Sequence, residues 1–392
     1  MKKLDNSRDL SAETNSMNMP APNSMCAVHL TGHGGIEKLV YRDDVPTPVP
    51  ADDEVLIQVA AAGMNNTDIN TRIGWYSKDM TIGTPTADAG DGTEVESASM
   101  GDWKVGLSFP RIQGADIVGH IVAAGSSVDS GRIGQRVTCD PYVLQSDDQQ
   151  GWENSGFLGA DYDGGFAQFV AVPARNAYRI SERVALTDAA LATLPCSGGT
   201  AMNMLLMAHV GPGDIMLVTG ASGGVGTFLI QLGHHLGADV IAIAGKSKFE
   251  QLSVLSPKAI IDRNAADQAA AILAATGGRK VTVIADVVGG DRFTEYLSLL
   301  KRGGRYVTAG AIAGPIVALD LRTLYLKSLE FYGSSVYRRD TFPKLLEIVE
   351  QGGVDPLVAS TRPLSEIREA QLAFLEKKHI GSLVLVPPPV EG

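Results

Sequence analysis

A glycine-rich stretch in the middle of the chain has the residue types of a phosphate-binding loop. It follows an apolar run expected to form a strand, Ile215–Thr219, and opens an amphipathic run expected to form a helix, Val225–Leu236. Glycines let a phosphate approach the backbone, and the first turn of a helix offers unpaired N–H groups and a positive dipole end. A second expected strand, Val240–Ala244, lies where a dinucleotide fold requires it. The residues expected to hold a dinucleotide are Gly220, Ala221, Ser222, Gly223, Gly224, Val225 and Gly226. An ordinary α/β turn, which also collects glycine, is the alternative.

The residues after the second strand indicate which dinucleotide is bound. NAD-binding proteins place Asp or Glu there to bind the ribose hydroxyls. This sequence instead has Gly245 followed by Lys246, Ser247 and Lys248. A carboxylate would repel a 2′-phosphate, whereas lysine and a hydroxyl would bind it, so NADP(H) is the expected cofactor. The alternative is that both lysines are solvated residues at the start of a helix.

The elements around these residues divide the chain into two parts. After Pro173, strands alternate with helices, which is typical of βαβ units and a parallel sheet. The further strands expected there are Val281–Asp286 and Arg305–Ala309, and the further helices are Asp188–Thr193, Gly199–Ala208, Ala265–Ala275 and Arg292–Leu300. Past Ser335 one more helix, Thr341–Gln351, is expected, and then extended segments. The first half is β-rich, with strands expected at Cys26–Leu30, Glu54–Ala61, Ile117–Ala123, Arg136–Cys139 and Phe166–Val172.

Length and composition are consistent with this division. A chain of 392 residues is long enough for two domains. A net charge of −11 argues against a nucleic-acid or anionic-membrane surface. Three cysteines without paired spacing suit a reducing cytoplasm, and we expect neither a signal peptide nor a membrane span. We expect a small-molecule substrate and a homodimer or homo-oligomer.

From Met25 onward the chain resembles the medium-chain dehydrogenase/reductase superfamily, in its quinone-oxidoreductase and enoyl-thioester-reductase-like branch. The stretches that carry the resemblance are Val55–Val59, Ala62–Asp68, Gly114–Gly119, Asp163–Ala167, Leu194–Cys196, the glycine loop, Asp286–Gly290 and Lys301–Arg305. The resemblance implies an α/β protein with a GroES-like β-rich catalytic domain, built from both chain ends, and a central Rossmann domain with a doubly wound parallel sheet. The expected divisions are a flexible tail (1–24), a catalytic domain (25–178) with an insertion (77–110), a Rossmann domain (179–334) and a return to the catalytic domain (335–392). Asp286 is counted among the cofactor-binding residues.

Zinc-dependent members of this superfamily hold their metal with a Cys in the motif around Asn65 and a His-Glu pair at residues 115 and 116. This sequence has Asn65, Ala115 and Asp116 at those places. An amide and a methyl group cannot replace a thiolate and an imidazole on Zn²⁺. No metal site is therefore expected.

Without a Lewis acid, oxidation of an alcohol lacks a means of stabilising an alkoxide. Hydride addition to a conjugated carbonyl or a quinone needs only a proton or hydrogen-bond donor. The resemblance to the Gly-x-Tyr pattern of enoyl-thioester reductases makes Tyr76 the candidate donor. It gives Thr67 the place of a proton-relay hydroxyl and Asn66 a contact with cofactor or substrate.

Three alternatives remain open at this point. Tyr76 packs beside Trp75 and has no chemical role, or the enzyme is a zinc-free alcohol or aldehyde dehydrogenase, or the chain is a non-catalytic cofactor-binding relative. The insertion 77–110 begins beside Tyr76, and loops of this length are often lids or binding loops.

Overall fold

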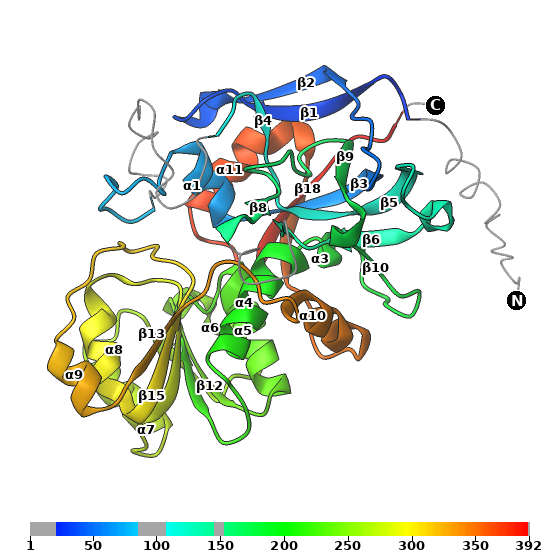
Figure 1. Ribbon diagram of the computed structural model, residues 1–392. Helices are drawn as coiled ribbons and strands as arrows, with labels where there is room; N and C mark the ends of the chain where they lie inside the picture. The colour runs from blue at the N-terminus through cyan, green and yellow to red at the C-terminus, as the bar shows by residue number, and fades with distance from the viewer. Residues whose placement is uncertain (1–20, 85–106, 145–152, 391–392) are drawn as a thin grey trace, which may run out of the picture.

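The computed structural model describes residues 21–84, 107–144 and 153–390 of the chain (Figure 1). Residues 1–20 of the expected tail and 85–106 of the expected insertion lie outside the described residues. The two ends of the described chain meet in one β-rich domain, and the middle of the chain forms a second domain below it in Figure 1.

The β-rich domain contains a small sheet and a large one. The small sheet has the order β2-β1-β4, and the large sheet has the order β10-β6-β5-β3-β18-β17, with β9 also paired to β3. Their bounds are β1 (Ser24–Leu30), β2 (Leu39–Pro46), β3 (Glu54–Met64), β4 (Arg111–Ile112), β5 (Asp116–Ala124), β6 (Arg136–Cys139), β9 (Phe169–Pro173), β10 (Ala177–Arg179), β17 (Val358–Pro363) and β18 (Ser382–Val386). Strand β18 runs antiparallel to β3, with Leu383 opposite Met64. The C-terminal segment is therefore an integral part of the domain that the N-terminal half begins.

Two short hairpin strands, β7 (Tyr142–Val143) and β8 (Gly156–Phe157), extend from this domain toward the second one. Their aromatic residues pack together, because the rings of Tyr142 and Phe157 lie 4.9 Å apart, centre to centre. This pair forms part of the wall of the cavity described below.

The second domain is a six-stranded sheet in which every neighbouring pair is parallel, with the order β13-β12-β11-β14-β15-β16. The strands are β11 (Ile215–Val218), β12 (Asp239–Ala244), β13 (Ala259–Asp262), β14 (Val281–Asp286), β15 (Leu300–Thr308) and β16 (Glu330–Gly333). This order confirms the expected doubly wound Rossmann sheet. The strand order reverses between β11 and β14, and ligands of such sheets bind beyond the carboxyl ends of the strands at that point.

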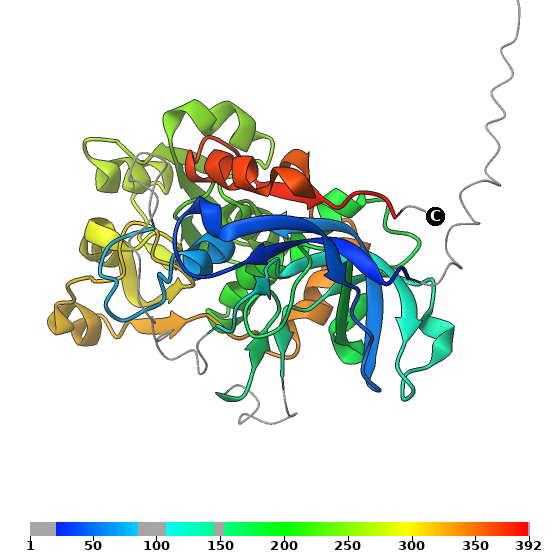
Figure 2. The same cartoon turned by 90° about the horizontal axis from the view of Figure 1, so that it is seen from above.

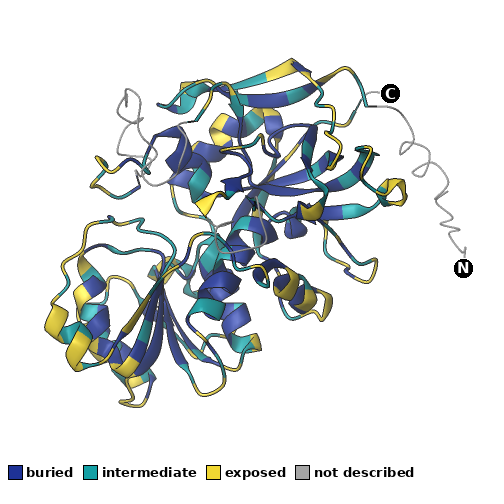
Figure 3. Cartoon of the chain, in the orientation of Figure 1, coloured by how far each residue is buried: buried dark blue, intermediate teal, exposed yellow. Residues whose placement is uncertain are grey.

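Helices cover both faces of this sheet, and for that reason β11 and β14 are buried along their whole length (Figure 3). The helices of this domain are α4 (Gly199–Met207), α5 (Gly224–His235), α6 (Phe249–Ser253), α7 (Gln268–Ala275), α8 (Phe293–Leu299), α9 (Leu321–Leu326) and α10 (Thr341–Glu350). Helix α3 (Asp188–Leu191) packs instead against β3 and β5 of the β-rich domain. None of the helices in the described part of the chain has the length and apolar character that crossing a bilayer requires.

The expectation of extended segments after Thr341–Gln351 holds for β17 and β18, but it missed helix α11 (Ile367–Leu375), which lies between them. Its buried residues Ile367, Ala370 and Phe374 recur at helical spacing and pack in the same core cluster as Leu39 of β2. Figure 2 shows this helix running above the blue strands of the small sheet. The signal is present in the sequence, but charged residues between the apolar ones obscure it.

Several other elements were not expected, among them two strands of the Rossmann sheet and one helix beside the cavity. Strand β13 and strand β16 are edge strands of four residues each, too short to show a clear pattern. Helix α1 (Asn66–Arg72) begins with a capping box, in which the carboxylate of Asp68 accepts from the N–H of Asn65 at 2.8 Å.

Candidate active site

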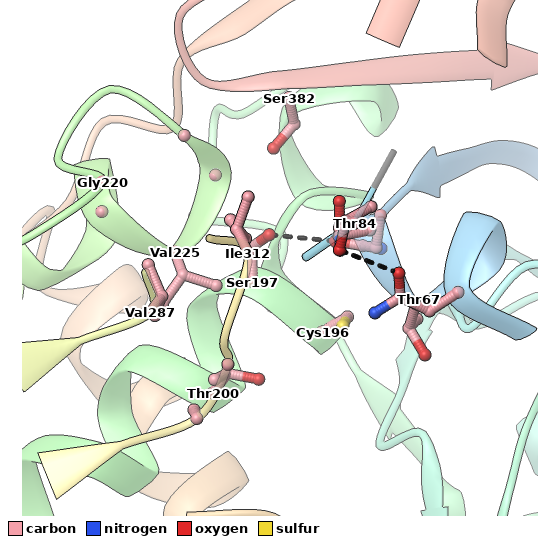
Figure 4. Close-up of a pocket in the computed structure, with 18 of the residues that line it drawn as sticks. Thr67, Thr84, Cys196, Ser197, Thr200, Gly220, Val225, Val287, Ile312 and Ser382 are labelled. Carbon is pink, nitrogen blue, oxygen red and sulfur yellow. Dashed lines mark hydrogen bonds between the residues drawn. The ribbon is translucent and has the colours of Figure 1, made fainter. Parts of the chain in front are cut away.

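A cavity of about 300 Å³ lies between the two domains (Figure 4). The glycine loop and α5 form one wall, and α1 with the segment after it forms another. The segment between α11 and β18 and the hairpin β7–β8 add to the lining. Further lining residues are Cys196, Ser197, Thr200, Val287, Ala309, Gly310, Ala311, Ile312, Ser334 and Ser335. The cavity therefore lies at the switch point of the Rossmann sheet and is closed by the β-rich domain.

The glycine loop has the geometry of a dinucleotide cradle. Gly220 has a φ of +56°, and a Cβ on Gly226 would come within 2.3 Å of the carbonyl oxygen of Gly220. No side chain caps the N-terminus of α5, whose first residue is Gly224. The N–H groups of this first turn are thus free to bind an anion, so these residues fit a pyrophosphate.

The loop residues divide into two groups. Five of the expected residues line the cavity, and these are Gly220, Gly223, Gly224, Val225 and Gly226. Ala221 is buried behind the loop, where its N–H donates to the carbonyl of Ile243 at 3.1 Å. Ser222 faces the C-terminal segment, because its carbonyl accepts from the N–H of Gly381 at 3.0 Å. Ala221 and Ser222 therefore shape the loop and do not line the cavity.

Asp286, expected to contact the cofactor, does not line the cavity either. Its carboxylate is fully buried and accepts from the hydroxyl of Tyr306 at 2.6 Å and from the N–H of Val288 at 2.8 Å. It also accepts from the hydroxyl of Thr219, the residue just before Gly220. Asp286 is thus a positioning residue that ties the end of β14 to the end of β11.

The basic residues after β12 have different environments. Lys246 and Ser247 are exposed, but the Nζ of Lys248 donates to the carbonyls of Lys377 and His379 at 2.7 and 2.8 Å. Lys248 is therefore committed to the C-terminal segment, and burial, followed by the charge of Arg263, lowers its pKa.

Arg263, which the sequence interpretation did not single out, lies beside the end of β12. A Cβ on Gly245 would be 3.6 Å from its Nε, and its side chain is exposed. It was missed because it follows β13, a strand that was not predicted. An arginine at this place is the group that dinucleotide folds use for a 2′-phosphate.

Three expected catalytic residues, Asn66, Thr67 and Tyr76, all line the cavity. The hydroxyl of Tyr76 donates to Oγ1 of Thr67 at 3.1 Å. The side chain of Asn66 accepts from Lys377 at 3.0 Å and donates to Thr84 at 3.2 Å. Burial raises the pKa of Tyr76, so its hydroxyl keeps its proton at neutral pH. The ring of Tyr76 also packs edge-on against Trp75 at 5.6 Å, so packing and a proton-donating role are compatible.

The positions where zinc-dependent relatives hold metal form a closed hydrogen-bond network. The Nδ2 of Asn65 donates to one oxygen of Asp116 at 2.8 Å, and the N–H of Cys196 donates to the other at 2.6 Å. The Oδ1 of Asn65 accepts from Ser197 at 3.0 Å. Burial raises the pKa of Asp116 to about 8.

The donor set therefore does not fit zinc. Ala115 packs against Phe157 and Ala160 and offers no ligand atom. Across the described ranges, no group of three His, Cys, Asp or Glu side chains is placed to hold a metal ion.

Aromatic and cationic residues that were not anticipated complete the cavity. Tyr142 and Phe157 from the hairpin lie on the same lining as Trp75 and Tyr76. Lys377, between α11 and β18, brings an ammonium group to this lining. The pair Lys377-Lys378 before the last strand is a weak signal, because only the fold shows which of the two faces the cavity.

Comparisons with known proteins agree with this architecture. Residues 51–182 match the family described as the alcohol dehydrogenase GroES-like domain, and residues 224–351 match the zinc-binding dehydrogenase family. A putative alcohol dehydrogenase from Sinorhizobium meliloti 1021 has a similar solved structure, with 45% identity, a TM-score of 0.85, and 94% of this chain and 98% of that chain covered.

Curated relatives have several activities. The quinone oxidoreductase-like protein 2 of Bos taurus is 30% identical, with 74% of this chain and 80% of that protein covered. Two Sulfurisphaera tokodaii proteins, an NAD-dependent alcohol dehydrogenase and an acryloyl-coenzyme A reductase, are 27% and 25% identical, with 90% and 88% of this chain and 98% and 96% of theirs covered. The chain belongs to the medium-chain dehydrogenase/reductase superfamily, and its β-rich domain is the expected GroES-like domain. It is an oxidoreductase of that superfamily.

Proposed function

We propose that this protein is a zinc-independent reductase that uses NADPH to reduce a conjugated carbonyl compound, an enone or enoyl derivative, or a quinone. The observation that carries the proposal is the Tyr76–Thr67 hydroxyl pair, which lines the same cavity as the glycine loop. The amide of Asn65 and the methyl group of Ala115 take the places of two metal ligands. The site therefore offers a proton donor where zinc-using relatives offer a Lewis acid.

The residues of the glycine loop support binding of a dinucleotide, as their geometry fits a pyrophosphate. When bound, the reduced nicotinamide supplies the hydride. Lys246, Ser247 and Arg263 support the choice of NADPH, because they surround the end of β12 without a carboxylate at Gly245. The similarity to NAD-dependent alcohol dehydrogenases makes this preference one to test directly.

The proton step is assigned to Tyr76. As hydride reaches the β-carbon of the substrate, the alkene electron pair moves toward the carbonyl oxygen and gives an enolate. The O–H bond of Tyr76 breaks as its proton passes to the enolate. Thr67, 3.1 Å from the Tyr76 oxygen, is placed to hydrogen-bond the phenolate and to return a proton to it. No metal takes part in these steps.

The aromatic lining of the cavity supports a flat acceptor. Trp75, Tyr76, Tyr142 and Phe157 give it an aromatic side, and rings of this kind pack against planar conjugated groups. Relatives named as a quinone oxidoreductase-like protein and an acryloyl-coenzyme A reductase use acceptors of this chemical type, as their names state.

A second candidate function, zinc-free alcohol or aldehyde oxidoreduction, is favoured by the similarity to alcohol dehydrogenases. One experiment separates the two. Oxidation of NADPH is followed with a panel of quinones, cyclic enones, enoyl thioesters, saturated aldehydes and saturated ketones, all in the presence of a chelator. We expect turnover with at least one of the first three classes and little with the saturated carbonyl compounds. Turnover confined to the saturated compounds would contradict the proposal.

A further inference from the structure

Lys377 has an unusual backbone and side-chain environment. Its φ is +53°, in the left-handed region that residues other than glycine rarely adopt. Its Nζ lies 3.0 Å from Oδ1 of Asn66 and 4.1 Å from the centre of the Phe374 ring. The ammonium group is therefore held in the cavity by one neutral amide and one aromatic face.

The groups that face Lys377 do not compensate its charge. Burial, followed by the charge of Lys248, lowers the pKa of Lys377 to about 8. Burial, followed by Lys377 and Lys248, lowers the pKa of His379 to about 4, so this imidazole is neutral at pH 7. In the part of the chain that the structure describes, neither Asp nor Glu forms an ion pair with Lys377. A half-buried ammonium with neutral and cationic neighbours favours an anionic ligand.

The backbone around Lys377 is tied to the glycine loop. The Nζ of Lys248 donates both to the carbonyl of Lys377 at 2.7 Å and to Oγ of Ser222 at 3.1 Å. Gly381 donates to the carbonyl of Ser222 and forms a β-bridge with Gly223. The segment 377–381 thus lies directly against the loop, whose free N–H groups open into the same cavity.

We propose that Lys377 binds the pyrophosphate of the dinucleotide from the catalytic-domain side of the cavity, opposite the N-terminus of α5. The inference rests on the dinucleotide site of the proposed function. It does not depend on the choice between NADPH and NADH, which share the pyrophosphate, or on the identity of the substrate.

A consequence for pH dependence follows. A bound diphosphate favours the charged ammonium and raises the pKa of Lys377 above its value in the free protein. Since the free value is about 8, dinucleotide affinity falls as the pH rises through 8, and binding at pH 8 takes up about half a proton.

The test compares Lys377→Met with Lys378→Met. Lys378 is the exposed neighbour, paired with Glu376 at 3.1 Å, so the control removes the same charge outside the cavity. Affinities are measured by calorimetry for three ligands: NADPH, ADP-ribose, which carries the pyrophosphate without nicotinamide, and adenosine 2′-monophosphate, which has no phosphate on its 5′ oxygen. Titration in two buffers of different ionisation enthalpy gives the proton uptake.

We expect Lys377→Met to weaken the affinities for NADPH and ADP-ribose by about 10- to 100-fold, the scale of a charge-assisted phosphate contact. Binding of the 2′-monophosphate should change less than about twofold, and Lys378→Met should leave all three affinities within that range. Proton uptake should disappear in Lys377→Met. Lys377→Arg keeps a permanent charge, so it should bind ADP-ribose with an affinity that stays constant between pH 7 and about 9.

Two results would overturn the inference. One is equal ADP-ribose affinity in the wild type and Lys377→Met. The other is a rise in the Michaelis constant of the reducible substrate with no change in dinucleotide affinity, which would assign Lys377 to binding the substrate. If Lys377→Met does not fold, an ADP-ribose affinity of Lys377→Arg that still falls through pH 8 would overturn it equally. Failure of any enone or quinone to react leaves these binding results unaffected, so the two proposals fail separately.

Discussion

Replacement of Tyr76 by Phe removes one hydroxyl and leaves the ring in place. In the structure this hydroxyl donates to Thr67 at 3.1 Å, and the ring packs against Trp75 at 5.6 Å. Loss of one such hydrogen bond costs about 1 kcal/mol of unfolding free energy, which corresponds to a fall in Tm of roughly 1–2 °C for a chain of this size. Packing against Trp75 should survive.

The effect on turnover should be much larger than the effect on stability. Loss of a general acid lowers the rate by about 10²-fold, or about 2.7 kcal/mol in the activation free energy. The substitution does not touch the glycine loop, so NADPH affinity should stay within about twofold. Quinones should be less sensitive than enones, because water can protonate a reduced quinone oxygen.

The assay follows the loss of NADPH absorbance in a single turnover, with an enone at saturating concentration. Single-turnover kinetics separate the chemical step from product release. The control is Tyr296→Phe, in which a buried tyrosine loses its hydrogen bond to Gln268 at 2.9 Å in the Rossmann domain, away from the cavity. Tyr296→Phe should lose stability and keep its turnover.

The pH profile gives an independent check. Because burial raises the pKa of Tyr76, the donor stays protonated through mildly alkaline pH. Ionisation of this phenol should therefore cause no fall in enone turnover below pH about 10, its ordinary value. Enone turnover of Tyr76→Phe within about twofold of wild type, where loss of a general acid predicts far more, would refute the assignment.

Three further predictions follow from the described residues. Arg263→Ala should weaken the affinity for NADPH by about 10-fold or more and leave the affinity for NADH nearly unchanged. The control Arg279→Ala, whose side chain pairs with Asp239 at the other end of β12, should change neither affinity. Equal losses for both cofactors would contradict a 2′-phosphate contact. Purified protein should contain no stoichiometric zinc and should keep its activity in a chelator, because Asn65 and Ala115 replace two ligands. Elemental analysis that finds one zinc per chain would contradict this and favour a zinc-dependent alcohol dehydrogenase. Two or more copies should associate through the exposed Leu321, Tyr325 and Leu326 of α9 and the edge strand β16. Sedimentation should show this association, and a Tyr325→Glu variant should dissociate. A monomeric wild type at micromolar concentration would contradict the prediction.

The centre of the Rossmann sheet could be predicted from the sequence because β11 and β12 are almost entirely apolar runs. The glycine loop adds a local constraint, since only glycine fits at Gly226 against the carbonyl of Gly220. Edge strands β13 and β16 escaped prediction because each pairs on one side only and has four residues. The position of Arg263 was missed along with β13, which places it.

Motif position alone did not determine which side chains face the cavity. Asp286 belongs to a familiar motif, yet its carboxylate turns toward Thr219 and Tyr306, because these donors lie on neighbouring strands. Lys248 turns toward the carbonyls of Lys377 and His379, which come from a segment more than a hundred residues away in the sequence. Such contacts depend on how the C-terminal return packs, and no local pattern encodes them.

The most direct test of the central claim follows the hydride itself. Metal-free protein is mixed with NADPH that carries deuterium at the transferable position of the nicotinamide, and with cyclohex-2-enone or another enone that the substrate panel identifies. Mass spectrometry and NMR then locate the label in the product. The proposed reductase should give a saturated ketone with one deuterium at the β-carbon. An allylic alcohol with deuterium on the former carbonyl carbon, or activity that appears only when zinc is added, would contradict it.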